Sequence, residues 1–173
     1  MNLMSVNLGE YLVKGSAWCS AFLMLAAFLA ARRERPTRNL WTAACAVYLL
    51  HFCLGFGGYH NWSHAAAASY TAMLTYDVIH VRTSAVLWGN YLFTLVWVAD
   101  VLWWWLWPMA RQQRPRWVAL IIYGFLATIM FCGTFIFTSN PLRWVILGGV
   151  IAVSSVRCRN RAMNNTPEPP LPA

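Results

Sequence analysis

The chain has 173 residues, of which 60% are hydrophobic, 16% are aromatic and only 10% are charged. A soluble domain typically carries about a quarter charged residues, so this composition excludes a disordered chain and argues against a soluble enzyme. Lysine and arginine number 13 against five acids, but they stand in short blocks beside apolar stretches rather than along one polar face. They therefore indicate membrane topology and not nucleic-acid binding.

Apolar stretches of about 20 residues, the length that a transmembrane helix needs, occur four times. They cover residues 8–31, 40–59, 84–107 and 117–137. A fifth stretch, 141–156, is shorter; it begins at a proline, which is favoured in a first helical turn, and it spans if its flanking arginines reach the interface. We predict an all-α, polytopic membrane bundle over residues 1–163 with five transmembrane helices, four long and one short. A disordered Pro-rich tail follows over 164–173.

The basic blocks orient this bundle by the positive-inside rule, which counts Lys and Arg in short loops. Arginines gather in 32–38, 108–116 and 157–161, whereas the segment 60–83 between the second and third spans holds only Arg82. With five spans, all three blocks fall on the cytoplasmic side. We therefore expect a multi-pass protein of the cell membrane, of the kind found in bacterial inner membranes, with its N-terminus outside and its C-terminus in the cytoplasm.

Six tryptophans stand near the basic blocks, at the ends of the second, third and fourth spans. Tryptophan is enriched at the headgroup level of membranes because its ring is apolar and its N–H is polar. The alternative is that such a stripe holds a chlorin, a quinone or a sterol. We expect all six to anchor the cytoplasmic interface: Trp41, Trp103, Trp104, Trp105, Trp107 and Trp117.

Two ionisable residues lie inside predicted spans, His51 in the second and Asp100 in the third. Charge is costly in a bilayer, so such residues are candidates for function. Because the two spans run antiparallel, Asp100 comes to about the depth of Tyr48 and His51, and we predict a hydrogen-bonded Tyr48/His51/Asp100 cluster. This cluster would be either a polar clamp between helices or a site for a proton or ligand.

The second span ends in a glycine-rich stretch that includes Gly55, Gly57 and Gly58. Glycine removes side-chain bulk and lets another helix approach closely in a membrane. Gly55 and Gly58 share the helical face of His51, so we expect tight helix packing on that face.

The segment 60–83 is predicted to form one short extracytoplasmic helix. Ser63 is a suitable N-cap, and the Ala-rich run from His64 to about Tyr76 has strong helix propensity. The run is too short and too polar for a span. Alternatively, it extends the third span outward.

Three of the four histidines fall in this outer segment. If the helix is continuous, His60 and His64 share one face, and Asp77 and His80 share another. Together they would form a complete ligand set for a divalent metal such as zinc or copper, or would hold a haem at the outer face. The alternatives are that these side chains line the water interface or contact a partner.

No nucleophile elbow, zinc-protease motif or phosphate-binding loop occurs in the sequence, which argues against an enzyme. The sequence favours a small integral membrane protein that is a non-catalytic subunit or accessory, packed against a partner membrane protein or a second copy of itself. A metal- or haem-binding protein is one alternative, through His60, His64, Asp77 and His80. A small transporter or proton-handling protein is the other, through His51 and Asp100.

Overall fold

The protein is described here by a computed structural model that covers residues 3–31, 34–136, 141, 144–145, 147–149, 151–152 and 154–155. The chain divides into two units, Met1–Ser139 and Asn140–Ala173. Each regular element that the structure describes is helical. This confirms the predicted all-α class over the described part of the chain.

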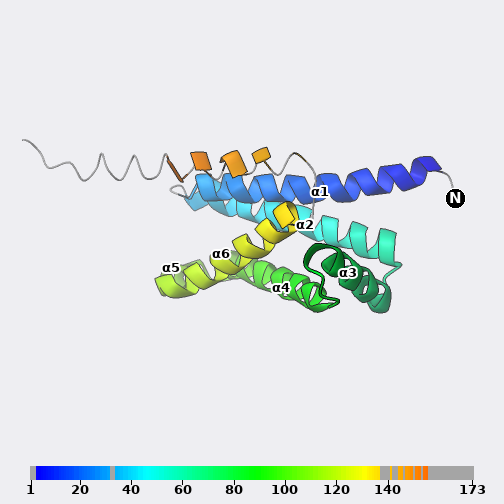
Figure 1. Ribbon diagram of the computed structural model, residues 1–173. Helices are drawn as coiled ribbons and strands as arrows, with labels where there is room; N and C mark the ends of the chain where they lie inside the picture. The colour runs from blue at the N-terminus through cyan, green and yellow to red at the C-terminus, as the bar shows by residue number, and fades with distance from the viewer. Residues whose placement is uncertain are drawn as a thin grey trace, which may run out of the picture. The chain divides into compact units, whose positions relative to one another are not determined.

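The described residues of the first unit form six α-helices and a short π-helix (Figure 1). Four stretches among the described residues are long and apolar enough to cross a membrane: Gly9–Leu29, Glu34–His60, Ala85–Leu106 and Arg116–Ile136. They correspond to the four long spans predicted. The elements are α1 (Leu3–Leu29), α2 (Glu34–His60), α3 (His64–Ile79), α4 (Ala85–Leu106), α5 (Pro108–Gln112), α6 (Arg116–Phe131) and the π-helix η1 (Cys132–Ile136).

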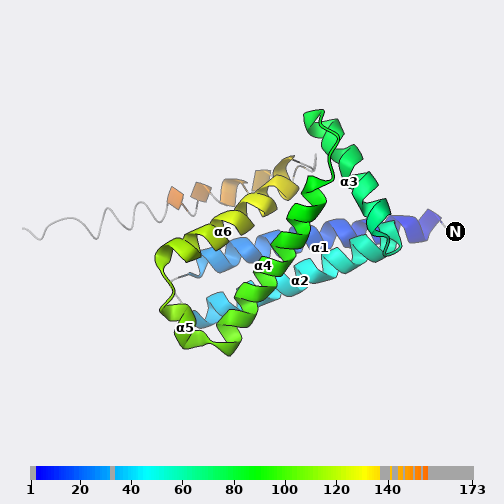
Figure 2. The same cartoon turned by 90° about the horizontal axis from the view of Figure 1, so that it is seen from below.

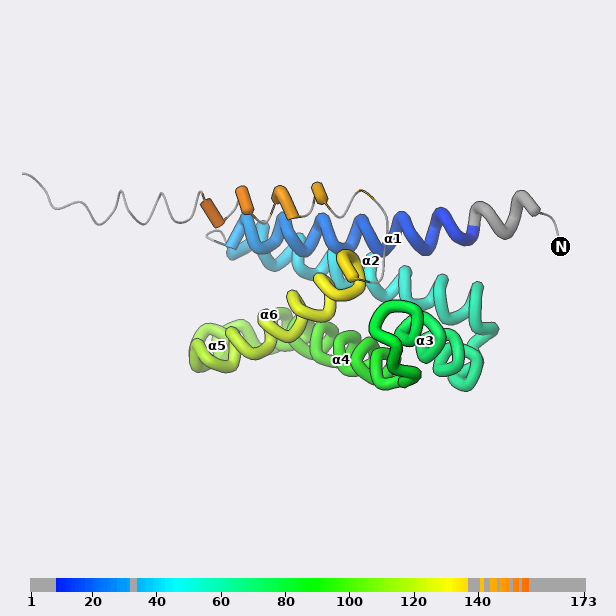
Figure 3. Tube along the Cα trace, in the orientation of Figure 1, coloured from blue at the N-terminus to red at the C-terminus, as the bar shows by residue number. Residues whose placement is uncertain are grey.

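The long helices form two layers within this unit. α1 and α2 run antiparallel and side by side, α4 crosses over α2, and α6 returns beside α4 (Figures 1 and 2). The tube in Figure 3 shows that α5 turns the chain back between α4 and α6. The first turn of α2 and α5 lie at one end of the unit, where Gln112 Nε2 is 3.4 Å from Glu34 Oε1. We call this end, comprising residues 34–38 and 108–116, the arginine-rich end.

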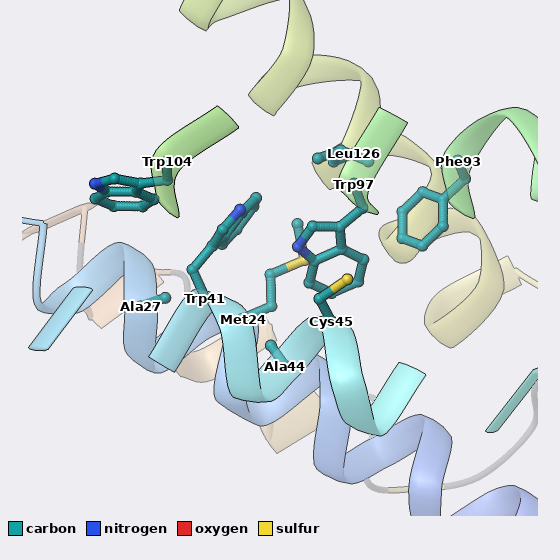
Figure 4. Close-up of a cluster of buried hydrophobic side chains, with 9 residues drawn as sticks. All are labelled: Met24, Ala27, Trp41, Ala44, Cys45, Phe93, Trp97, Trp104 and Leu126. Carbon is teal, nitrogen blue, oxygen red and sulfur yellow. The ribbon is translucent and has the colours of Figure 1, made fainter. Parts of the chain in front are cut away.

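The core lies where the two layers meet, and all four long helices contribute to it (Figure 4). The indole of Trp97 is at its centre, with ring centroids 5.3 Å from Trp41, 5.6 Å from Tyr48 and 5.2 Å from Phe93. Such tilted and edge-on aromatic pairs are favourable beyond the area they bury. The buried members are Met24, Ala27, Trp41, Ala44, Cys45, Phe93, Trp97, Trp104 and Leu126.

Small residues allow α1 and α2 to approach closely. Ala21 and Ala27 of α1 and Ala44 of α2 are buried. Ser20 Oγ of α1 donates to the Ala44 carbonyl oxygen at 2.9 Å. Small side chains and interhelical hydrogen bonds are the usual means of packing helices in lipid. The tight contact between spans therefore occurs here and not at the glycines of α2. An added Cβ at Gly55 or Gly58 would meet no described atom within 4 Å.

A sharp reversal separates α2 from α3. Asn61 and Trp62 both adopt left-handed φ angles, 47° and 59°, and the Trp62 N–H donates to the Phe56 carbonyl oxygen at 3.0 Å. This bond spans six residues and satisfies a carbonyl oxygen near the C-terminus of α2. The Ser63 side chain then caps α3 by accepting from the Ala66 N–H, which confirms the predicted N-cap and helix.

The helix α3 is separate from the third span. It ends at Ile79, followed by His80 in the left-handed conformation with φ 57°, and α4 begins five residues later at Ala85. The alternative of an outward extension of the span is therefore wrong. The extracytoplasmic location of α3 stays a prediction, as does the orientation of the bundle.

The second unit contains the predicted fifth span, 141–156, and the predicted tail, 164–173. The described residues 144–145, 147–149, 151–152 and 154–155 are helical. The rest of that span and the whole tail lie outside the described residues, so a fifth transmembrane helix stays a prediction.

Candidate functional site

A buried carboxylate at the arginine-rich end is the centre of a polar network. Asp100 of α4 is only 2% exposed. Arg114 Nη1 donates to its Oδ1 at 2.6 Å, and Trp41 Nε1 donates to its Oδ2 at 3.0 Å. Each carboxylate oxygen therefore has a partner, which is what a buried charge requires.

The hydroxyl of Tyr123 on α6 extends this network. Arg114 Nη2 donates to Tyr123 Oη at 2.9 Å, and Arg111 Nη2 donates to the same oxygen. The guanidinium of Arg111 also lies over the ring of Trp104, with its Cζ 3.3 Å from the ring centroid. The network thus connects α2, α4, α5 and α6 through side chains.

The two guanidiniums differ in their electrostatic surroundings. Burial by itself lowers the pKa of Arg114, but the hydrogen bonds and charges of Asp100 and Tyr123 together outweigh burial, so this pKa is raised. Burial also lowers the pKa of Arg111, and the attraction of Tyr123 and Asp100 only partly offsets it. Arginine is always protonated in proteins. The network therefore contains two positive charges and one negative charge.

Two prolines explain how Arg114 comes back to the span that precedes it. Pro108 begins α5 directly after Trp107, and proline is favoured in a first helical turn. Pro115 occupies the N-cap of α6 in an extended conformation, with ψ 142°. The chain reverses between these prolines, and Arg114 is thereby placed against Asp100.

Comparisons with known proteins assign no function to this network. The chain matches no protein-family model, no curated protein and no solved structure. The function must therefore be inferred from the geometry of the chain itself.

Tyr48 and His51 have partners other than Asp100. Thr94 Oγ1 donates to Tyr48 Oη at 3.3 Å, and His51 Nδ1 lies 2.9 Å from the Val13 carbonyl oxygen. The two rings are neighbours, with centroids 6.0 Å apart. The structure does not bring the three residues into the predicted hydrogen-bonded cluster, because both Asp100 oxygens bind groups nearer the arginine-rich end.

The reversal after α2 places the outer histidines in different surroundings. His60 packs on Tyr70, with ring centroids 5.3 Å apart, whereas His64 Nδ1 lies 3.0 Å from Tyr91 Oη. The first pair does not share a continuous helical face, because α2 ends at His60.

The other two predicted ligands lie at the far end of α3. Asp77 is exposed, and His80 terminates the helix with its ring beside Tyr76. In the part of the chain that the structure describes, no three His, Cys, Asp or Glu side chains lie close enough to hold a metal ion. The structure thus does not bring His60, His64, Asp77 and His80 together as one ligand set.

Two tryptophans predicted as interfacial anchors belong to the core instead. Trp41 is 2% exposed and Trp104 is 5% exposed, because one binds the Asp100 carboxylate and the other lies beneath Arg111. By contrast, Trp105, Trp107 and Trp117 are exposed at the same end, as expected of anchors.

Proposed function

We propose that this chain is a non-catalytic subunit of a membrane protein assembly, and that the outward face of α2 contacts a transmembrane helix of its partner. The observation that carries the proposal is the kind of side chain on that face. Its exposed residues in the middle of the span are Ala43, Ala46, Leu50 and Cys53, three of them small. They recur at the three- and four-residue intervals that define one side of a helix.

The large exposed side chains of α4 and of the first turns of α6 are of a different kind. Leu92, Leu95 and Leu102 are exposed on α4, and Trp117, Leu120 and Ile121 are exposed on α6. Further along α6, the exposed residues Gly124, Ala127 and Thr128 are small. Large flexible apolar side chains suit contact with lipid tails, whereas small ones let helix backbones approach each other. The contrast favours a protein partner at α2 and lipid at α4 and at the first turns of α6.

The polar groups of the spans support a structural role. Asp100 of α4 is held by Arg114 of the loop before α6 and by Trp41 of α2. His51 of α2 faces the Val13 carbonyl oxygen of α1. A proton or ion carrier needs groups that exchange partners during a cycle. The arrangement of these side chains fits a clamp better than a transport path.

The test is a crosslinking experiment from Cys53 in native membranes. The other four cysteines are replaced by alanine, and a photoreactive maleimide is attached to Cys53. The matched control lacks all five native cysteines and contains the substitution Leu120→Cys, on the exposed face of α6. We expect a discrete protein adduct from Cys53 and only lipid adducts from the control.

The mass of the adduct identifies the partner as a second copy or as a different membrane protein. Lipid adducts alone at Cys53, or the same protein adducts from both positions, would contradict the proposal.

A further inference from the structure

Two guanidinium groups at the arginine-rich end lie on aromatic rings without a carboxylate partner. The Cζ of Arg38 lies 4.0 Å from the centroid of the Trp105 ring, and that of Arg111 lies 3.3 Å from the centroid of Trp104. Neither group belongs to an ion pair among the described residues. The Nε atoms of Arg38 and Arg111 are buried and have no hydrogen-bond partner among the described residues.

The nearby acids do not supply the missing partner. Both oxygens of Asp100 are used by Arg114 and Trp41, so the second cation of the network, Arg111, stays uncompensated. Glu34 is exposed and its Oε1 accepts from a glutamine amide. A buried donor without an acceptor is costly, and a buried cation without an anion is more so. Within the described ranges, this end of the bundle therefore offers no anion to Arg111.

The geometry of the two groups suits an anion with several oxygens. Stacking on an indole fixes the plane of a guanidinium while its N–H groups, which lie in that plane, can still donate to a phosphate. Arg111 Nη2 already donates to Tyr123 Oη, so the Nε and Nη1 groups of Arg111 are those proposed for the anion. Trp105, in turn, is held by its own hydrogen bond from Nε1 to Thr42 Oγ1, at 3.0 Å. The ring beneath Arg38 is therefore fixed in position.

The depth of the site indicates where the anion comes from. The exposed indoles of Trp105, Trp107 and Trp117 lie at this end, and exposed tryptophans mark the headgroup layer of a bilayer. We propose that Arg38 and Arg111 bind the phosphate groups of anionic phospholipid headgroups. This inference is independent of the partner helix proposed for α2.

The test measures lipid binding to the full chain purified in a neutral detergent. Native mass spectrometry follows the binding of phosphatidylglycerol, with phosphatidylcholine as the zwitterionic comparison. A hydrogen bond between charged groups is worth about a tenfold change in affinity or more. We expect Arg38→Gln to weaken phosphatidylglycerol binding about tenfold, and Arg38→Gln with Arg111→Gln to weaken it about 100-fold.

The matched control removes the same charge elsewhere at this end. Arg35 and Arg116 are exposed, and neither lies over a described ring, so Arg35→Gln with Arg116→Gln is expected to change the affinity less than twofold. An equal loss of phosphatidylglycerol affinity in both double variants would overturn the proposal, because it would mean that the lipid is attracted by the general positive charge and not bound at Arg38 and Arg111. The described hydrogen bonds and ion pair of Asp100 involve Trp41 and Arg114 and not Arg38. Arg38→Gln alone therefore decides the matter if the double variant does not fold.

A separate arm distinguishes a lipid headgroup from free phosphate. Inorganic phosphate is added in excess to the protein with bound phosphatidylglycerol. We expect the lipid to remain bound, because its acyl chains add apolar contact that the free ion lacks. Displacement of the lipid by phosphate would overturn the assignment to a lipid.

Discussion

The Asp100 carboxylate provides the sharpest test of how the bundle is held together. Asp100→Asn keeps the size of the side chain and an oxygen that can accept from Trp41, but it removes the charge that Arg114 binds at 2.6 Å. The two side chains are 0% and 5% exposed, so solvent screens the pair little. The variant leaves Arg111 and Arg114 as uncompensated cations beside Tyr123.

The expected loss of stability follows from this geometry. Removing one member of a buried ion pair costs about 3–5 kcal/mol, and the retained bond to Trp41 is worth about 1 kcal/mol. We therefore expect Asp100→Asn to lower the free energy of unfolding by about 3 kcal/mol. Adding Arg114→Gln removes one of the stranded cations and should recover a measurable part of the loss.

The assay is unfolding by SDS in mixed detergent micelles, followed by near-ultraviolet circular dichroism. The buried indoles of Trp41, Trp97 and Trp104 report on the core. Asp77→Asn is the control, since Asp77 is exposed on α3 and its substitution should cost less than about 0.5 kcal/mol. If Asp100→Asn costs no more than Asp77→Asn, or if adding Arg114→Gln only increases the loss, the network does not stabilise the fold as inferred.

Two further predictions concern the contact between α1 and α2 and the state of the thiols. Ser20→Ala should destabilise the protein by about 1 kcal/mol because it removes the hydrogen bond from α1 to the Ala44 carbonyl oxygen of α2. The hydroxyl of Ser16 bonds within α1, so Ser16→Ala should cost less, and equal effects of the two variants in SDS unfolding would contradict this. Cys45 is buried and Cys19 is exposed, so N-ethylmaleimide in mild detergent should modify Cys19 first and Cys45 only on unfolding. Equal rates of modification by mass spectrometry would contradict the burial of Cys45.

The long spans could be predicted from the sequence because a bilayer sets a minimum length for an apolar run. The ends of the observed helices differ from the predicted ends of the spans by a few residues. The second span was predicted to begin at residue 40, yet α2 begins at Glu34, since a helix continues past the apolar region wherever polar residues can still hydrogen-bond along it. Ser63 was identifiable as a cap because the capping chemistry is local.

The partner of Asp100 could not be predicted in the same way. A charge inside a span marks Asp100 as important, but nothing local shows that Arg114, 14 residues later, returns to it. That contact depends on the reversal between Pro108 and Pro115. Arg114 also belongs to a basic block that the positive-inside rule explains as a topology signal. The sequence therefore gives no reason to assign it a structural role.

Two other contacts lack any sequence signal. His51 faces the backbone carbonyl oxygen of Val13. Every residue carries a backbone carbonyl group, so the sequence does not indicate which one His51 faces. Trp41 stands at the end of a span, where an interfacial anchor is the common outcome. Its burial depends on a carboxylate on another helix, which only the tertiary arrangement supplies.

The most direct test of the proposed assembly is the mass of the complex extracted from native membranes in a mild detergent, compared with that of Ala46→Leu. Ala46 is exposed on the outward face of α2, so a larger side chain should leave the fold intact and block a partner helix. We expect the wild-type chain in a complex heavier than the 19.7 kDa monomer and the variant at the monomer mass. A monomeric wild-type chain, or an undiminished complex for Ala46→Leu, would contradict the role proposed for α2.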